Sequence, residues 1–371
     1  MTPIRMRMHL ALGLVALACA SLTAPAHADD FLEAAKKKVA VATKTKEVWD
    51  GPTSGPKAVA AKTLVFVAAD MKNGGIVGVS KGVEEAGKAI GWNVRVIDGQ
   101  GSVSGRTAAL NQALALKPGG IVVGGFDVTE QKVAFDNAAK SGIPLVGWHA
   151  GDKPGPNDKV GLFANVTTVT DDVADIAASW AVVDSGGKAG VVIFTDSQYA
   201  IAVYKARAME AIIKKCGGCT VLSFEDSPIA ESSTRMPQLT TSLLQRFGDK
   251  WTHSLAINDL YFDFMGPSLT AAGKKGDGNP KAVSAGDGSE AAYQRIRTKR
   301  FQAGTVPEPL NMQGWQIVDE MNRAFSKAAW SGYSPKVHLV TAENVGKDGG
   351  PKNEFDPDNG YRDQYKRIWG K

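Results

Sequence analysis

A pair of cysteines is the first feature whose residue types and spacing suggest chemistry. The run 216–219 reads Cys-Gly-Gly-Cys, which fits a redox pair, half of a zinc site or a structural disulfide. A redox pair would begin a helix, whereas this one follows the helix-like run 200–215. A zinc site would need two further ligands, and the histidines are scattered along the chain. In an oxidising compartment we expect a structural disulfide between Cys216 and Cys219.

Three other runs resemble catalytic, cofactor or metal motifs. The run 78–82 (GVSKG) matches a nucleophile elbow, but it lies inside a predicted helix instead of directly after a strand. The run 99–101 (GQG) follows a strand, but the third glycine of a dinucleotide loop comes one place late. The run 356–360 (DPDNG) resembles a calcium loop, but proline takes a ligand position and Lys366 replaces the bidentate glutamate. We therefore expect no enzyme activity, no cofactor and no metal.

Side chains near the ends of predicted strands are better candidates for a binding site. They are Asp70, Asn73, Phe126, Asp127, His149, Tyr199, Asn258, Tyr261 and Asp287, to which we add Arg207 in a predicted helix. Their oxygens accept hydrogen bonds from ligand hydroxyls, a guanidinium donates several, and an aromatic face covers the apolar side of a sugar ring. The structural alternative makes the acidic and amide groups helix caps, the aromatic groups core residues and Arg207 a surface residue.

The elements that must position these residues alternate between strand and helix, in units of about thirty residues. Apolar runs predict strands at 64–68, 94–97, 121–123 and 145–147, and a second series at 190–194, 221–224, 255–257 and 282–284. A late helix (312–329), a late strand (337–340) and a short helix near 361–369 follow. We expect an α/β fold of two tandem doubly wound parallel-sheet lobes. In such sheets ligands bind beyond the carboxyl ends of the strands.

The first residues predict export. Arg5 and Arg7 precede the apolar run 10–17, and Ala26-His27-Ala28 offers a cleavage site after Ala28. We expect residues 1–28 to be a signal peptide and the mature chain to be a soluble periplasmic protein. The alternative is a lipoprotein anchored on Cys19, which fits poorly because the expected leucine would fall at residue 16.

Residues 29–61 predict an N-terminal helical arm and linker, which we expect to pack on the outside of the first lobe. The whole chain has 371 residues, with 43 basic and 38 acidic side chains. The length suits two domains. The small charge imbalance, without basic runs interleaved with aromatic residues, argues against a nucleic-acid partner.

An exported tandem of this kind resembles the type I periplasmic binding proteins of the ribose-binding group, over about residues 63–340. The matching runs are 142–146 (GIPLV), 256–259 (AIND) and 285–288 (AGDG), and 205–207 (KAR) lies where the family carries Arg-x-Arg. The second arginine of that string holds ligand hydroxyls in the family. The chain departs from the family pattern in three places. The family's Asp-Arg pair after the fourth strand is replaced by His149-Ala150, and its paired Phe of the first cleft loop is absent, with Gly74-Gly75 near that place. The family's Asn after the third strand is replaced by Gly124.

The resemblance implies two lobes joined by three hinge crossovers. Lobe 1 would comprise 62–164 plus 308–339, and lobe 2 would comprise 165–307 plus 340–371, with crossings near 164–165, 305–308 and 338–341. It implies a monomeric receptor that captures a sugar or polyol between the lobes and delivers it to the permease of an ABC importer. A sugar acid held by Arg207, or an amine, are alternative ligands. A sensor for a chemoreceptor or kinase is the alternative output, and a secreted enzyme is a third hypothesis.

Overall fold

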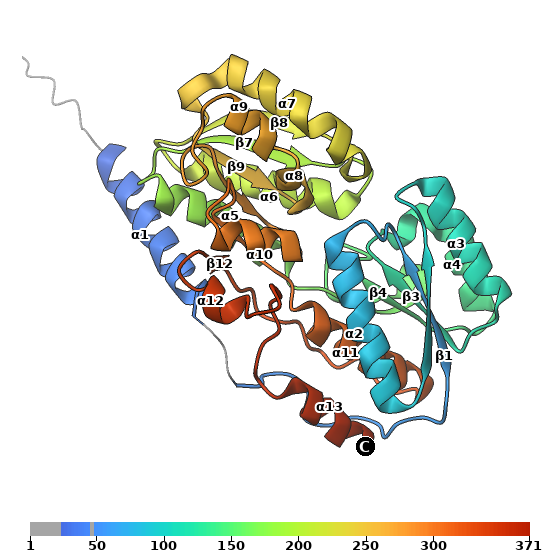
Figure 1. Cartoon of the computed structure of the whole chain (residues 1–371). Helices are drawn as coiled ribbons and strands as arrows, with labels where there is room; N and C mark the ends of the chain where they lie inside the picture. Colours follow the sequence, from blue (N-terminus) through green and yellow to red (C-terminus); the bar gives the residue numbers. More distant parts are fainter. Residues whose placement is uncertain (1–23, 45–47) are drawn as a thin grey trace, which may run out of the picture.

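The structure is a computed structural model that describes residues 24–44 and 48–371. The chain forms two α/β lobes, each built on a six-stranded sheet (Figure 1). The predicted fold of two doubly wound lobes is therefore confirmed. Residues 1–23, which hold most of the predicted signal peptide and Cys19, lie outside the described residues.

The sheet of the first lobe has the strand order β2-β1-β3-β4-β6-β5. Its strands are β1 (Thr63–Ala68), β2 (Asn93–Asp98), β3 (Gly120–Gly124), β4 (Leu145–Trp148), β5 (Gly155–Asn157) and β6 (Leu162–Val166). The helices of this lobe are α2 (Gly74–Ile90), α3 (Val103–Ala115), α4 (Lys132–Lys140) and α11 (Leu310–Phe325). All pairs are parallel except β5 with β6. Helices cover both faces, so β1 and β3 are continuous apolar runs.

The sheet of the second lobe has the strand order β12-β11-β10-β9-β7-β8. Its strands are β7 (Gly190–Thr195), β8 (Thr220–Asp226), β9 (His253–Ala256), β10 (Lys281–Ser284), β11 (Gly304–Thr305) and β12 (Val340–Thr341). Its helices are α5 (Thr170–Asp184), α6 (Ala200–Lys215), α7 (Ser232–Phe247), α8 (Leu260–Asp263), α9 (Gly266–Ala271), α10 (Glu290–Arg297) and α12 (Val345–Asp348). Only β12 runs antiparallel within this sheet.

The N-terminal arm lies on the second lobe, which corrects the expected position on the first. Helix α1 (Ala24–Ala42) runs along α5, at the left of Figure 1. Ala35 and Ala42 are buried in the core of the second lobe, and Lys38 forms an ion pair with Asp175 at 2.6 Å. The small residues of α1 allow this close approach, and Leu339 N donates to the carbonyl of Ala42 at the end of the helix.

The C-terminal helix lies on the other lobe from the one expected. The short helix predicted near 361–369 is present as α13 (Tyr361–Trp369), but it packs on α11 and α2 of the first lobe. Trp369 stacks on Trp315 at 5.5 Å and donates from Nε1 to Asp319. Three aromatic side chains of α13, Tyr361, Tyr365 and Trp369, are buried in the core of the first lobe, and this burial holds the C-terminal helix on that lobe.

The chain passes between the lobes more often than the family pattern implies. The first crossing, 167–169, follows β6 and lies a few residues beyond the expected position at 164–165. The second, 306–309, joins β11 to α11, and the third leads from α11 to β12. Two further passages connect α1 to β1 and α12 to α13, again from the second lobe to the first.

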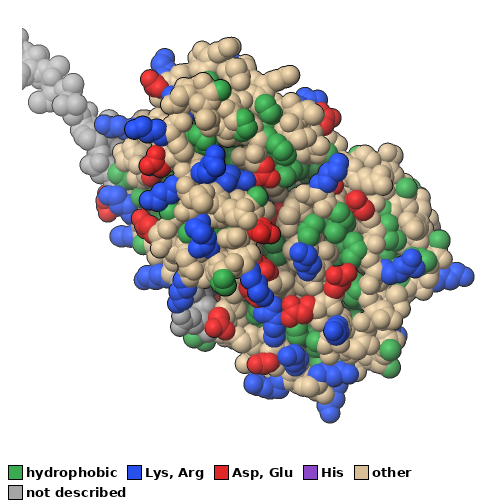
Figure 2. All heavy atoms as spheres, in the orientation of Figure 1, with side chains coloured by type: hydrophobic (Ala, Val, Ile, Leu, Met, Phe, Trp, Pro, Cys, Tyr) green, Lys and Arg blue, Asp and Glu red, His purple; other side chains and the backbone are tan. Residues whose placement is uncertain are grey.

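The surface carries both signs of charge. Figure 2 shows basic and acidic side chains interspersed over one face. Among the described residues, no helix combines the length and hydropathy of a membrane span. Within the same part of the chain, no three His, Cys, Asp or Glu side chains are grouped to hold a metal ion.

Candidate ligand-binding cleft

Polar side chains from both lobes meet around a cavity of about 60 Å³ between the lobes. The structure brings Asp70, Asn73 and His149 of the first lobe together there with Tyr199, Asn258 and Asp287 of the second. Each follows a strand or lies in the loop after one, as expected for the carboxyl ends of parallel strands.

Asp70 and Asn73 come from the loop between β1 and α2. Asp70 Oδ1 accepts from the backbone N–H of Lys72, and its Oδ2 has no partner among the described residues. Asn73 is the N-cap of α2, because its Oδ1 accepts from Gly75 N at 2.9 Å. Its amide keeps both donors, so the same side chain caps the helix and faces the cavity.

His149 follows β4 with a φ of +49° and lies at the junction of the two lobes. Its ring stacks on Trp148 at 4.0 Å. Nε2 is 3.2 Å from Glu308 Oε1, and Nδ1 is 3.9 Å from Asp287 Oδ1 in the second lobe. The ring therefore connects a crossing segment on one side with the opposite wall of the cleft on the other.

Glu308 is a buried carboxylate that sequence reasoning treated only as a hinge position. It accepts hydrogen bonds from the hydroxyl and N–H of Thr168 and from Gln313. Burial opposes its ionisation, but the hydrogen bond and charge of His149, with the bond from Thr168, outweigh burial and lower the pKa of Glu308 to about 2. Ionised Glu308 can only accept, so Nε2 of His149 is the donor.

Asn258 and Asp287 follow β9 and β10. Asn258 Nδ2 donates to Asp287 Oδ2 at 2.7 Å, while its Oδ1 accepts from Leu260 N. Burial raises the pKa of Asp287, an effect that the charges of His149 and Lys205 partly offset. Asp287 receives fewer hydrogen bonds than Glu308, which explains the opposite direction of the two shifts.

The cation of the cleft is Lys205 and not the predicted Arg207. Arg207 projects from the opposite face of α6, has 58% of its side chain exposed and pairs with Glu210 at 2.7 Å. Lys205 is buried, lines the cavity and donates from Nζ to the carbonyl of Ala285 at 2.7 Å. The run Ala202, Lys205, Ala206 and Met209 follows the helical repeat of a buried face, a signal that could have identified Lys205.

Three other predicted residues have structural positions away from the cavity. Phe126 is fully buried in the first core. Asp127 caps a short 3₁₀ helix, accepting from Thr129 N at 2.7 Å. Tyr261 is buried against Phe194, and its hydroxyl donates to the carbonyl of Ser227. Phe126 and Tyr261 are therefore core residues and Asp127 is a helix cap, as the structural alternative expected.

Arg106 and Tyr199 join the two lobes at the edge of the cleft. Arg106 in α3 is fully buried, pairs with Glu130 at 2.8 Å and donates to the hydroxyl of Tyr199 at 3.2 Å. Burial raises the pKa of Tyr199 to about 12, although the charge of Arg106 opposes the shift. No sequence motif pointed to Arg106. With His149 near Asp287, this contact defines a conformation in which the lobes touch.

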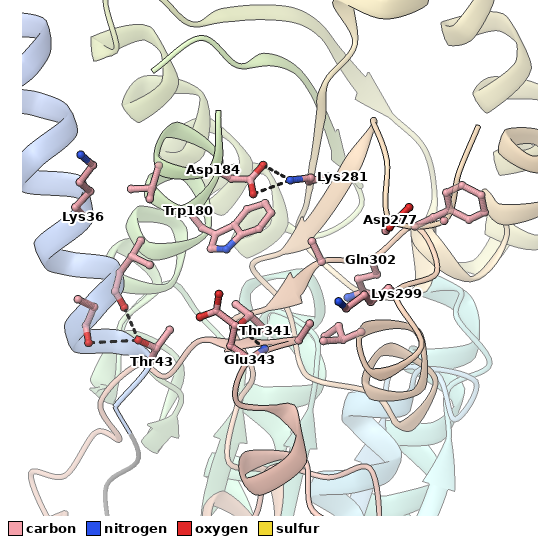
Figure 3. A pocket seen from close by; sticks show the side chains of 18 residues that line it. Lys36, Thr43, Trp180, Asp184, Asp277, Lys281, Lys299, Gln302, Thr341 and Glu343 are labelled. Carbon is pink, nitrogen blue, oxygen red and sulfur yellow. Dashed lines mark hydrogen bonds and ion pairs between the residues drawn. The ribbon is translucent and has the colours of Figure 1, made fainter. Parts of the chain in front are cut away.

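A larger cavity, of about 710 Å³, lies on the second lobe between α1, α5 and the sheet edge at β12 (Figure 3). Trp180 lies at its wall, beside the ion pair of Asp184 and Lys281 at 2.8 Å. Its lining comes from the second lobe and the arm, so the first lobe cannot close over it. We therefore place the candidate ligand site in the interlobe cleft.

The predicted disulfide is present between Cys216 and Cys219, with Cα atoms 5.3 Å apart. It links the end of α6 to the start of β8, so neither cysteine begins a helix as a redox pair would. Cys216 is buried in the second core, which agrees with a structural role.

Comparison with known proteins agrees with the geometry. The family described as a periplasmic binding protein domain matches residues 64–328. An ABC transporter solute-binding protein from Agrobacterium vitis bound with alpha-D-tagatopyranose has a TM-score of 0.69 at 14% identity, covering 79% of this chain and 99% of its own. Another from the same organism, with bound allitol, has a TM-score of 0.66 at 17% identity, covering 77% and 97%.

A third similar structure is the periplasmic binding protein of the arabinose ABC transporter from Shewanella sp. ANA-3. It has a TM-score of 0.66 at 15% identity and covers 76% of this chain and 93% of its own. A comparison with curated protein sequences finds no match. Identities at this level establish the shared fold, while the matched domain extends over most of the chain.

Proposed function

The chain belongs to the periplasmic binding protein family, and from this membership we propose that it is a periplasmic receptor for a sugar or polyol, which it delivers to an ABC importer. Proteins of this family and fold bind solutes and are not enzymes. Export through the predicted signal peptide, cleaved after Ala28, would place the receptor in the periplasm.

One observation carries this proposal: polar side chains of both lobes converge on the cavity between the lobes. Asp70 and Asp287 supply carboxylate acceptors, whereas Lys205 and Asn73 supply donors. A hydroxyl both donates and accepts, so a polyhydroxylated ligand satisfies both kinds of group at once. Buried polar groups that are left without partners cost stability, so such a ligand favours the closed lobes.

Closure is the step that would couple binding to transport. A ligand that touches both lobes binds the closed form more tightly and shifts the population toward it. The contacts of Arg106 with Tyr199 and of His149 near Asp287 are available only when the lobes meet. We propose that the permease recognises this closed arrangement.

Small-angle scattering during ligand titration tests the proposal. We expect the radius of gyration to fall when a sugar or polyol that raises the melting temperature is added. The Asp287→Asn variant should require a higher ligand concentration for the same compaction. A set of sugars and polyols that stabilises the protein without any compaction would contradict the closure mechanism.

A further inference from the structure

The space between the lobes is small in the arrangement that the structure shows. A volume of about 60 Å³ accommodates on the order of four to six water-sized groups. A three-carbon triol is close to that size, whereas a six-carbon sugar has about twice as many non-hydrogen atoms. A ring of that size would require the lobes to stay further apart.

Glycines at the lobe contacts account for the small volume. A Cβ on Gly75 would lie 2.3 Å from the Cβ of Asp287 in the opposite lobe. A Cβ on Gly74 would lie 2.8 Å from the Cβ of Ser289. The lobes therefore approach until the backbone of α2 meets side chains of the second lobe, and the cavity is the space that this close approach leaves.

The apolar part of the cavity wall combines four isoleucines with Trp148 and Tyr199. Ile76 comes from the first lobe, and Ile201, Ile229 and Ile257 come from the second. One face of Trp148 is covered by His149, which stacks on it at 4.0 Å. The guanidinium of Arg106 lies over the ring of Tyr199 at 5.0 Å. Branched aliphatic side chains suit the methylene face of a short carbon chain.

The buried charges around the cavity include both signs. Asp70 and Asp287 are acidic, and Lys205 is basic. Glu308 and His149 already interact with each other beside them. The two acidic groups outnumber Lys205, so an anionic ligand would add further negative charge to this buried site, whereas a neutral hydroxylated ligand would not.

From these four observations we propose that the cleft selects a short acyclic polyol, of about three or four hydroxylated carbons, over a sugar ring. The inference rests on the proposed function, because it takes the interlobe cleft as the ligand site. The carbon chain lies between the isoleucines, and its hydroxyls pair with Asp70, Lys205 and Asp287.

Calorimetric titration of the full exported protein, freed of bound solutes by unfolding and refolding, tests the proposal. The probes are glycerol, erythritol, D-ribose and D-glucose. We expect glycerol or erythritol to bind at least about tenfold more tightly than either sugar. Tighter binding of ribose or glucose would overturn this inference and leave the receptor proposal intact. Absence of binding by all four, and by a wider set of sugars, would overturn both.

Two matched variants on α6 separate size selection from general damage. Ile201 lines the cavity, whereas Ile212, also half-buried on the same helix, does not. Ile201→Ala should enlarge the cavity and shift the ribose-to-erythritol affinity ratio toward ribose by about tenfold. Ile212→Ala should leave the ratio unchanged. Equal ratios in both variants and the unaltered protein would show that the isoleucine wall does not set ligand size.

Discussion

At the scale of single residues, α6 shows how a shift of two positions along a helix changes a side chain's role. Each residue of a helix is rotated by about 100° from the one before, so Lys205 and Arg207, two positions apart, are rotated by about 200° and lie on opposite faces. Lys205 is enclosed by both lobes and has one carbonyl partner among the described residues. Its remaining donors are available to a ligand. Arg207 instead pairs with Glu210 and covers Phe224 at the surface.

Paired substitutions on this helix test the assignment. Lys205→Met keeps the length of the side chain but removes a buried charged donor, so ligand affinity should fall by roughly ten- to a hundredfold. Arg207→Met should leave affinity unchanged. Isothermal titration with whichever polyol or sugar binds best measures both. A loss of affinity in the Arg207 variant, with the Lys205 variant unaffected, would contradict the placement of the cleft.

At the scale of elements, the crossing segments are held together by a buried carboxylate. Glu308 lies between β11 and α11 and accepts from Thr168 in the crossing that follows β6. Gln313 in α11 and His149 after β4 complete its partners. One side chain thus ties two hinge segments to the floor of the cleft.

Replacement of Glu308 by Gln should change how the free energy of unfolding depends on pH under acidic conditions. The pKa of Glu308 falls from 4.5 to about 2 on folding. Its contribution to the free energy of unfolding is therefore present above about pH 4.5 and is lost as the pH falls through 2. Glu308→Gln should lower stability at pH 7 by about 1–3 kcal/mol, with the difference shrinking toward pH 2. Denaturant titrations at several pH values would measure this convergence, and a constant difference would contradict it.

Helix α11 itself carries a buried carboxylate, Glu320, whose pKa shifts in the direction opposite to that of Glu308. Glu320 accepts from the N–H and hydroxyl of Ser331. Burial, with the nearby charge of Asp319, raises its pKa from 4.5 to about 7 in spite of the bonds from Ser331. The stability associated with protonated Glu320 is complete below pH 4.5 and is lost as the pH rises through 7.

Glu320→Gln should therefore make the protein more stable than the unaltered protein at pH 8, because no ionisation then occurs in the buried site. The advantage should disappear toward pH 5. Denaturation midpoints at pH 5 and pH 8 provide the comparison, and Glu290→Gln, an exposed position on α10, serves as a control. A variant that is equally destabilised at both pH values would indicate lost packing instead.

At the scale of the whole molecule, two terminal segments connect the lobes in addition to the three crossings. Helix α1 is anchored on the second lobe, and the segment after it binds α11 of the first, where Arg323 donates to Ser54 O and Asn322 to Pro56 O. The C-terminal segment leads from α12 on the second lobe to α13 on the first. We expect these connections to limit how far the lobes open.

Release of α1 should therefore widen the ligand-free form. Ala35→Asp places a carboxylate in the buried contact with α5, whereas Ala34→Asp places the same group on the exposed neighbour. Small-angle scattering should show a larger radius of gyration for ligand-free Ala35→Asp than for ligand-free Ala34→Asp. The radii of gyration of the two variants should be equal when ligand is bound. Identical ligand-free values would mean that the arm does not restrict opening.

Local pattern was enough to predict the lobes and part of the cleft. Continuous apolar runs such as 64–68 became the buried strand β1, because a strand covered on both faces needs apolar residues throughout. Asp70, His149, Asn258 and Asp287 could be placed near one another, because parallel strands end at the same edge of a sheet. The Cys-Gly-Gly-Cys spacing likewise predicted a disulfide that closes within four residues.

Contacts between elements were decided only by the tertiary structure. An amphipathic helix has an apolar face but no information about which lobe will cover it, so α1 and α13 each dock on the lobe opposite to the expected one. Lys205 is buried because α6 turns that face toward the cleft. The cavity between the lobes takes its size from Gly74 and Gly75 meeting the second lobe, a contact between residues more than two hundred positions apart that no local pattern records.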